Sequence, residues 1–273
     1  MEKITDTKII ISGSTLEVYK YKDKPVLYDF VIPEHFRKRR KTKILVIDEE
    51  SRLRKMESRK KGMRRAQSIL RRLINSNAWR WYKPNNDIFS PVFITLTFAK
   101  NVQDTKTANF LFSKFIKRLT YHIGEEKKSF LKYVVVTEFQ KRGAIHYHAI
   151  FFNLKFIDSN IFAKIWKQGF VKLNLIDHVT NVGAYVCKYM CKEFEDDRLD
   201  GTKRYFSSRG LKKPVVIREQ TEARRIFSLI PKELIKFESK FGGHMGKVEY
   251  TQCQIEKERS FNKVIPELYD NAC

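Results

Sequence analysis

The sequence predicts an α+β fold. Segments in which apolar residues alternate, as in strands, are interleaved with segments in which they recur every three or four residues, as in helices. Between residues 91 and 175 the order is strand, helix, strand, strand, helix, strand. This is the order of a ferredoxin- or RRM-like split βαβ arrangement, an antiparallel sheet with helices packed on one face. We expect the opposite face to stay open and to carry the functional residues.

Residues 91–98 predict the first strand, in which Ile94, Leu96 and Phe98 alternate with threonines on the other face. That threonine face is expected to approach a ligand. The side chain of Asp104 is placed to cap the helix that follows, whose apolar residues repeat every three or four positions. This helix should cover one side of the sheet.

The second helix of the sheet domain is predicted for residues 159–168, with Gly169 as its C-terminal stop. Residues 170–175 alternate again and complete the sheet as its fourth strand. Farther along, we predict a helix that begins around Pro231 and runs through Phe237.

Residues 132–152 predict a β-hairpin at the centre of the sheet. Two runs rich in β-branched and aromatic residues flank Lys141-Arg142-Gly143, whose glycine can adopt the left-handed conformation that a three-residue hairpin loop needs. Residues two apart on a strand share a face, so His146 and His148 project together while Tyr147 points the other way.

A candidate metal site follows from pairing across this hairpin. If Gln140 pairs with Ala144, Glu138 lies opposite His146 and diagonal to His148, within reach of both. Two imidazoles and a carboxylate then form a three-ligand site for a divalent metal, with positions left for water or substrate. A histidine on a strand is more commonly a surface or core residue, so the carboxylate at this register is what favours metal binding.

The composition points to a polyanionic partner. The 273 residues carry a net charge of +24 with a pI near 9.8, and 42% are hydrophobic, enough for a real core. Nucleic acid is the first candidate and a membrane surface the second. No apolar run approaches the roughly 20 residues of a bilayer span, and no signal-like segment opens the chain. With four cysteines best interpreted as free thiols, we expect a soluble protein of the cytoplasm.

A basic helix is predicted ahead of the sheet. Basic residues outnumber acidic ones severalfold between residues 37 and 72, and apolar residues recur at helical spacing through residues 51–76. Such a helix can hold DNA by its phosphates without reading sequence, whereas the alternative is a solvated face or a flexible arm. We predict DNA contacts at its arginines Arg64, Arg65, Arg71 and Arg72.

Residues 183–194 predict a helix that contains the pattern Tyr-x-x-Lys twice, Tyr185 to Lys188 and Tyr189 to Lys192. Residues four apart lie above one another on a helix, so the two tyrosines share a face. The pKa of a tyrosine hydroxyl is about 10, but a nearby metal and ammonium groups favour its phenolate, which can attack phosphorus. The alternative is an ordinary helix with tyrosines in its core stripe and lysines outside.

A basic and aromatic stretch follows this helix. Its cations and rings are suited to contact single-stranded DNA, in which bases stack on aromatic side chains and phosphates meet basic groups. An exposed loop is the alternative. The DNA-contacting residues predicted here are Lys192, Lys203, Arg204 and Arg209.

Three ordered motifs resemble those of the HUH endonuclease superfamily, the rolling-circle replication initiators. They are Phe93-Ile94-Thr95-Leu96-Thr97-Phe98, then Glu138 with Gly143-Ala144-Ile145-His146-Tyr147-His148, then Tyr185-Val186-Cys187-Lys188-Tyr189. From about residue 60 to residue 214 the chain is similar to phage and plasmid replication-associated proteins of the filamentous-phage gene II type.

The resemblance implies roles for these residues. Glu138, His146 and His148 would bind Mg or Mn, Tyr185 would be the nucleophile, and Lys188 would help to position the phosphate. Tyr189 falls where two-tyrosine members carry a second nucleophile, although an adjacent tyrosine can also only pack.

The resemblance divides the chain into four segments. These are N-terminal strands with a basic arm (1–50), a basic helical extension (51–90), the HUH endonuclease domain (91–214) and a C-terminal extension (215–273). Residues 242–248 lack the spacing of a phosphate-binding loop, so a host helicase and a host polymerase are the expected partners.

The function that the resemblance implies is initiation of rolling-circle DNA replication. The protein would nick and rejoin single-stranded origin DNA, folded as a stem-loop, through a metal-assisted 5′-phosphotyrosine intermediate. A relaxase or a single-strand transposase would use the same chemistry, although relaxases usually carry a third histidine where Glu138 stands. A zinc hydrolase and a non-catalytic basic DNA-binding protein are the competing interpretations.

Overall fold

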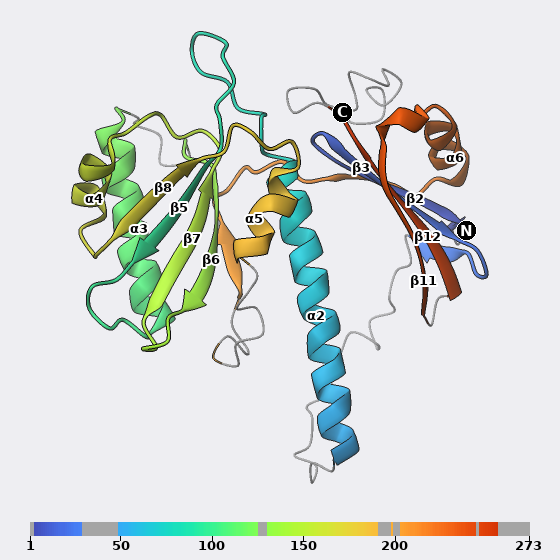
Figure 1. The fold of residues 1–273 in the computed structure, drawn as a ribbon, viewed down its shortest axis with the longest axis horizontal. Helices are drawn as coiled ribbons and strands as arrows, with labels where there is room; N and C mark the ends of the chain where they lie inside the picture. Colours follow the sequence, from blue (N-terminus) through green and yellow to red (C-terminus); the bar gives the residue numbers. More distant parts are fainter. Residues whose placement is uncertain are drawn as a thin grey trace. The chain divides into compact units, whose positions relative to one another are not determined.

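The computed structural model describes residues 3–28, 49–124, 130–190, 198, 203–243 and 246–255. The chain folds into two compact units (Figure 1). We call Gln67–Lys213 the central unit, and Met1–Ala66 together with Pro214–Cys273 the terminal unit. Each unit combines an antiparallel five-stranded sheet with helices, which confirms the α+β class.

The sheet of the central unit has the strand order β8-β5-β7-β6-β9, and every neighbouring pair is antiparallel. Its first four strands in chain order take positions 4-1-3-2, which is the ferredoxin-like arrangement. The short fifth strand extends the sheet beyond β6. The strands are β5 (Val92–Thr97), β6 (Tyr133–Phe139), β7 (Ile145–Phe151), β8 (Val171–Leu175) and β9 (Tyr205–Ser207).

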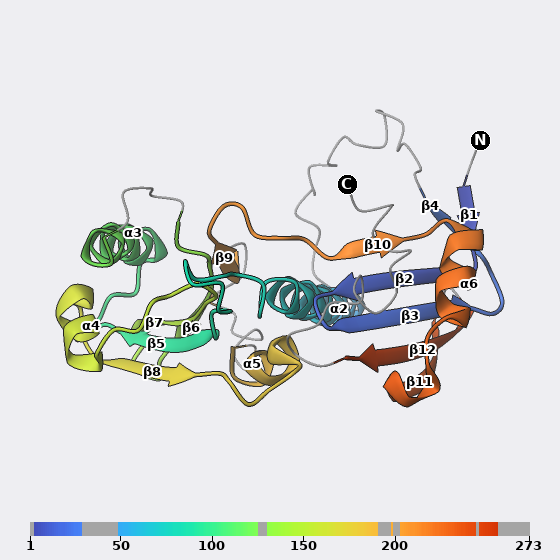
Figure 2. The same cartoon turned by 90° about the horizontal axis from the view of Figure 1, so that it is seen from above.

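Two helices, α3 (Thr105–His122) and α4 (Ser159–Trp166), cover one face of this sheet (Figures 1 and 2). The Asp104 side chain accepts hydrogen bonds from the amides of Lys106 and Thr107, so the predicted cap of α3 is confirmed. Aromatic and aliphatic side chains from the helices and the sheet form one buried core, which includes Leu96, Phe98, Phe112, Phe115, Tyr147, Phe151 and Trp166.

The end of α4 differs from the sequence prediction. Lys167, not Gly169, takes the left-handed conformation at the C-terminus, with φ of 63°. Gly169 instead packs against the main chain that follows β5, where a Cβ atom would lie 2.6 Å from the carbonyl oxygen of Thr97. Glycine is therefore needed at position 169 because two backbones approach closely there. No local sequence pattern shows this contact.

The second face of the sheet is open only in part. Helix α5 (Val182–Met190) and the last turns of α2 (Glu49–Asn75) lie on this side (Figures 1 and 2). The valines and isoleucine that β6 and β7 place there, Val134, Val136 and Ile150, are fully buried. Sequence periodicity identified the helices but not the face against which they pack.

Asn75 and Asn181 fix the start of α5. The amide of Gly183 donates to the side-chain oxygen of Asn75 at 2.6 Å, and the side-chain amide of Asn75 donates to Asn181 at 2.9 Å. The Asn181 side chain also accepts from the amide of Ala184, as a helix cap does. A Cβ atom on Gly183 would lie 2.3 Å from the carbonyl oxygen of Arg71, so this position has room only for glycine.

The terminal unit joins the two ends of the chain in one sheet. Its strand order is β10-β2-β3-β12-β11, and β1 (Lys3–Thr5) pairs separately with β4 (Val26–Tyr28). From the sequence, residues 1–50 and 215–273 are expected to be separate segments, whereas β3 pairs along its length with β12. The five strands are β2 (Thr7–Ser12), β3 (Thr15–Tyr21), β10 (Val215–Ile217), β11 (Ile235–Gly243) and β12 (Gly246–Gln254).

Helix α6 (Gln220–Ser228) covers one face of this sheet and buries Ala223 and Ile226 against it. The predicted helix around Pro231 is wrong: a single turn of 3-10 helix, η3 (Lys232–Leu234), leads directly into β11. Phe237 lies on that strand. Among the helices in the described part of the chain, none combines the length and apolar composition of a membrane span.

We expect Gly183→Ala to destabilise the protein by about 2 kcal/mol or more, because the added methyl group would displace the backbone of α2. Gly62→Ala is the matched control, since Gly62 lies on α2 with nothing within 4 Å of the added atom. It should stabilise the protein by about 0.5 to 1 kcal/mol through helix propensity. Urea denaturation measures the free energy of unfolding of both variants. Equal effects of the two changes would contradict the close contact between Gly183 and the backbone of α2.

Candidate active site

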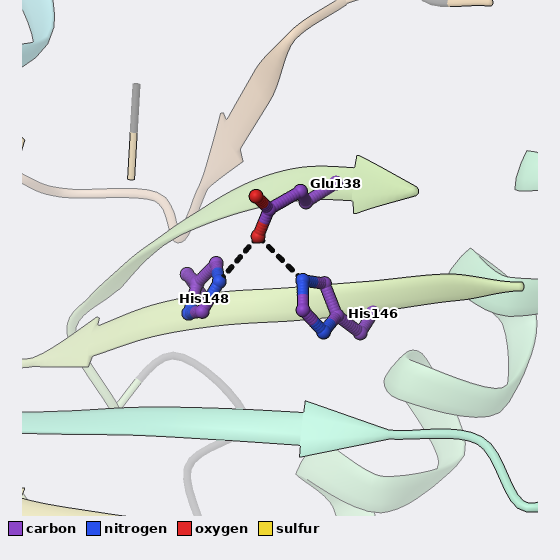
Figure 3. Close-up of side chains that lie close together, drawn as sticks. All are labelled: Glu138, His146 and His148. Atoms are coloured by element: carbon purple, nitrogen blue, oxygen red, sulfur yellow. Dashed lines mark hydrogen bonds and ion pairs between the residues drawn. The ribbon is translucent and has the colours of Figure 1, made fainter. Parts of the chain in front are cut away.

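The hairpin of β6 and β7 has the register that the sequence predicted. Glu138 is paired directly with His146, the amide of Gln140 donates to the carbonyl of Ala144 at 2.8 Å, and Gly143 has φ of +87°. Figure 3 shows Glu138 on β6 with His146 and His148 side by side on β7. These residues form the triad on which the candidate site is built.

The three side chains of the triad converge on one point. Oε2 of Glu138 contacts Nε2 of His148 at 2.5 Å and Nε2 of His146 still more closely. One ligand atom from each residue lies within 4.8 Å of the others, and all three side chains are half-buried. Among the described residues this is the one group of histidine, cysteine and carboxylate side chains close enough to hold a metal ion.

Burial and hydrogen bonding act in opposite directions on the Glu138 carboxyl. Burial raises its pKa. Hydrogen bonds with His146 and His148 lower the pKa by more than burial raises it, so that it falls to about 2. The carboxylate is therefore ionised at neutral pH, which is the form in which it binds a cation.

Two residues of β5 orient His148. Its Nδ1 atom lies 3.1 Å from the hydroxyl of Thr95, directly across the strand pair, which leaves Nε2 to face the triad. The ring of Phe93 stacks on the imidazole with centroids 5.6 Å apart and planes 8° apart. The expected approach of the threonine face to the site is thus met by Thr95, while the Thr97 hydroxyl hydrogen-bonds the main chain of Phe170.

A series of ring contacts joins the triad to the two tyrosines of α5. The ring of Tyr189 lies 6.4 Å from that of Phe93, which stacks on His148, and 5.5 Å from that of Tyr185. The core stripe of α5 consists of Val182, Val186 and Met190, and 45% of Tyr189 is exposed. Both tyrosines are thus on the triad's side of the sheet, outside the core stripe.

The neighbouring Tyr189 influences the ionisation of Tyr185. A charge on Tyr189 raises the pKa of Tyr185, and burial and a hydrogen bond between the two side chains act in the same direction. A negative charge on Tyr189 therefore opposes ionisation of Tyr185.

The surroundings of Tyr185 include one residue that no sequence pattern indicated. The imidazole of His178 meets the Tyr185 ring edge-on with centroids 5.8 Å apart, and its Nδ1 atom lies 3.2 Å from Asp177. His178 belongs to the loop before α5, where no periodicity relates it to the helix. Lys188 is exposed in the last turn of α5, and Lys192 lies outside the described residues.

The predicted DNA-contacting residues differ in exposure. Those that are exposed are Arg64, Arg65, Lys203 and Arg209, while Arg71, Arg72 and Arg204 are half-buried and have interactions within the chain. The amide of Thr137 donates to the carbonyl of Arg204 at 3.2 Å, which extends the β6–β9 ladder beyond β9. Lys203 directly precedes Arg204 in the chain, just beyond this ladder.

A comparison with known protein families identifies the segment that carries this arrangement. Residues 91–194 match the family of replication-associated proteins of the ORF2 and gene II protein type. The match begins at β5 and includes the triad and both tyrosines, and it confirms the resemblance to phage and plasmid replication-associated proteins. It covers well under half of the chain. No curated protein and no solved structure matches the chain.

We expect Thr95→Val to weaken binding of Mn²⁺ about tenfold, because the hydroxyl that orients His148 is lost. Thr95→Ser keeps the hydroxyl and should bind nearly as the unchanged protein does. Isothermal titration calorimetry with MnCl₂ in the absence of DNA measures both affinities. Equal Mn²⁺ affinities for the valine and serine variants would show that the Thr95 hydroxyl does not help to orient His148.

Proposed function

We propose that this replication-associated protein initiates rolling-circle replication by nicking and rejoining single-stranded origin DNA through a 5′-phosphotyrosine intermediate. The observation that carries the proposal is the continuous series of contacts from the triad through Phe93 to Tyr189 and Tyr185. A cation-binding group and a pair of phenols on one face of a sheet are the parts that such a transfer needs.

The residues present fit a divalent cation. Two imidazole nitrogens and an ionised carboxylate converge, Thr95 holds His148 in the orientation in which Nε2 faces inward, and three ligands leave positions for other oxygen atoms. We propose Mg or Mn at Glu138, His146 and His148. When bound, this ion would act as a Lewis acid on a phosphate oxygen.

The tyrosine then supplies the nucleophile. The hydroxyl oxygen of Tyr185 forms a bond to phosphorus, the bond from phosphorus to the 3′-oxygen breaks, and the tyrosine loses a proton while the 3′-oxygen gains one. Because the phosphodiester is exchanged for a phosphotyrosine, a 3′-hydroxyl can later attack the same phosphorus and restore the strand without a nucleotide cofactor.

Tyr189 is suited to a second transfer of the same kind. Its ring contacts that of Tyr185, so the two phenols lie side by side. We propose that Tyr185 makes the first cut and that Tyr189 acts when the replication fork returns to the origin. Alternating use needs two nucleophiles at one site.

The basic residues around the site would hold the DNA. Lys188 is three residues from Tyr185 on one helix, and we propose that it contacts the phosphate. Lys203 and Arg209 are exposed near β9, at the β6 edge of the sheet, and would contact the strand that leaves the site. A stem-loop origin, a host helicase and a host polymerase, all in the host cytoplasm, complete the proposal.

We expect Tyr185→Phe to abolish a covalent protein–DNA adduct. The protein is incubated with Mn²⁺ and labelled single-stranded oligonucleotides that tile the DNA around its coding region, and the adduct is detected on a denaturing gel. EDTA should prevent it, and Tyr189→Phe should retain it. Loss in Tyr189→Phe with retention in Tyr185→Phe would reverse the order of the nucleophiles, and retention in both would refute the role of α5.

His146→Ala should reduce cleavage at least a hundredfold and leave DNA binding nearly unchanged, since the phosphate contacts lie on other residues. His122→Ala is the control, because His122 ends α3 on the covered side of the sheet. Cleavage rates and salt-dependent binding are measured on the same oligonucleotide. Full cleavage by the His146→Ala variant would show that the triad is not needed for cleavage.

A further inference from the structure

The sheet of the terminal unit has a second face, opposite α6, that carries a group of aromatic rings. Leu16, Val18 and Cys253 point toward α6, and residues between them on β3 and β12 therefore point the other way. This face presents Tyr19 and Tyr21 from β3, Tyr250 from β12, and Phe237 and Phe241 from β11. We call these five residues the aromatic platform.

The strand register arranges the platform in rows across the sheet. Lys8, Tyr19, Tyr250 and Ser239 are successive partners on four neighbouring strands. The next row is formed by Tyr21, Val248 and Phe241. Tyr19 and Tyr250 have centroids 5.0 Å apart, and Phe237 lies 6.1 Å from Tyr250. The rings of Tyr19, Tyr250 and Phe237 thus form a connected surface, and Tyr21 and Phe241 lie in the next row.

The platform remains accessible at its β11 side and carries a cation at the other. Phe237 is 54% exposed and Phe241 is 48% exposed, values that are high for aromatic side chains in a folded sheet. At the opposite end the ammonium group of Lys8 lies 4.4 Å from the centroid of Tyr19 and 5.8 Å from that of Tyr21. Rings and an ammonium group are therefore presented together.

Buried polar groups hold the tyrosines in place. The hydroxyl of Tyr250 donates to the Glu17 carboxylate at 2.8 Å, and that of Tyr19 lies 3.4 Å from the same oxygen. Glu17 is itself almost fully buried, so its charge is not presented to a ligand. Fixed rings lose little conformational entropy when a flat ligand stacks on them.

We propose that the aromatic platform binds single-stranded DNA by base stacking, as a second DNA site on a different unit from the triad. Aromatic rings on an open sheet stack on unpaired bases of any sequence, and a neighbouring lysine meets the phosphates. The chain's charge of +24 suits a polyanion better than a neutral or basic protein surface. The identity of the ligand rests on the proposed function, but the cleavage chemistry is not needed.

The test measures binding of fluorescent oligothymidylate by the full chain in EDTA, by fluorescence anisotropy at several salt concentrations. The double variant Phe237→Leu/Phe241→Leu keeps apolar bulk but removes the rings, and we expect at least tenfold weaker binding. Lys8→Gln should weaken binding and make it less dependent on salt. Phe156→Leu is the matched control, since Phe156 is 95% exposed on the central unit.

Several outcomes would refute DNA binding by the aromatic platform. One is unchanged affinity for oligothymidylate in the double leucine variant, and another is an equal loss of affinity in the Phe156→Leu variant. Loss of self-association in sedimentation, with normal DNA affinity, would show instead that the face binds protein. Circular dichroism of each variant checks that the sheet is intact.

Failure of the nicking proposal gives a different pattern. In that case the unchanged protein forms no adduct with any oligonucleotide, whether or not the leucine variants bind DNA weakly. If the platform alone fails, adduct formation remains and the leucine variants bind normally.

Discussion

The cross-strand pairing of Glu138 with His146 is the constraint on which the candidate site depends. A slip of one residue would turn every side chain of β7 to the other face and separate the three ligands. The register is held from both faces, since Tyr147 packs among Phe98 and Phe112 on the helical side and its hydroxyl donates to Asn109 at 2.8 Å. The hydrophobic core and the triad thus specify the same alignment.

The position of the tyrosines depends on how α5 is anchored. Asn75 bonds the first turn of the helix, Gly183 lets its backbone approach that of α2, and Val186 and Met190 are buried. These contacts leave Tyr185 and Tyr189 beside the core stripe of the helix, outside its buried residues. A phenol on a packed helix is held more firmly than one on a loop, which suits a reaction that needs accurate placement of the attacking oxygen.

The two proposed DNA sites use different physics. At the triad, a small number of charged and polar groups would act on one phosphate, where accurate geometry matters most. On the aromatic platform, rings such as Phe237 and Phe241 would stack on bases of any sequence, where exposed flat area matters most. The proposed function, in which single-stranded DNA is held between cutting and rejoining, would use both kinds of contact.

The sequence alone determined features whose cause lies within a few residues along the chain: the hairpin around Gly143, the convergence of Glu138 with the histidines, the Asp104 cap, and the shared face of the two tyrosines. Only the tertiary structure decided which surfaces meet. The bond from Gly183 to Asn75, the stack of Phe93 on His148 and the pairing of β3 with β12 join residues far apart in sequence. Periodicity shows that a strand or helix has a face to bury, but the partner is chosen by packing of the whole chain.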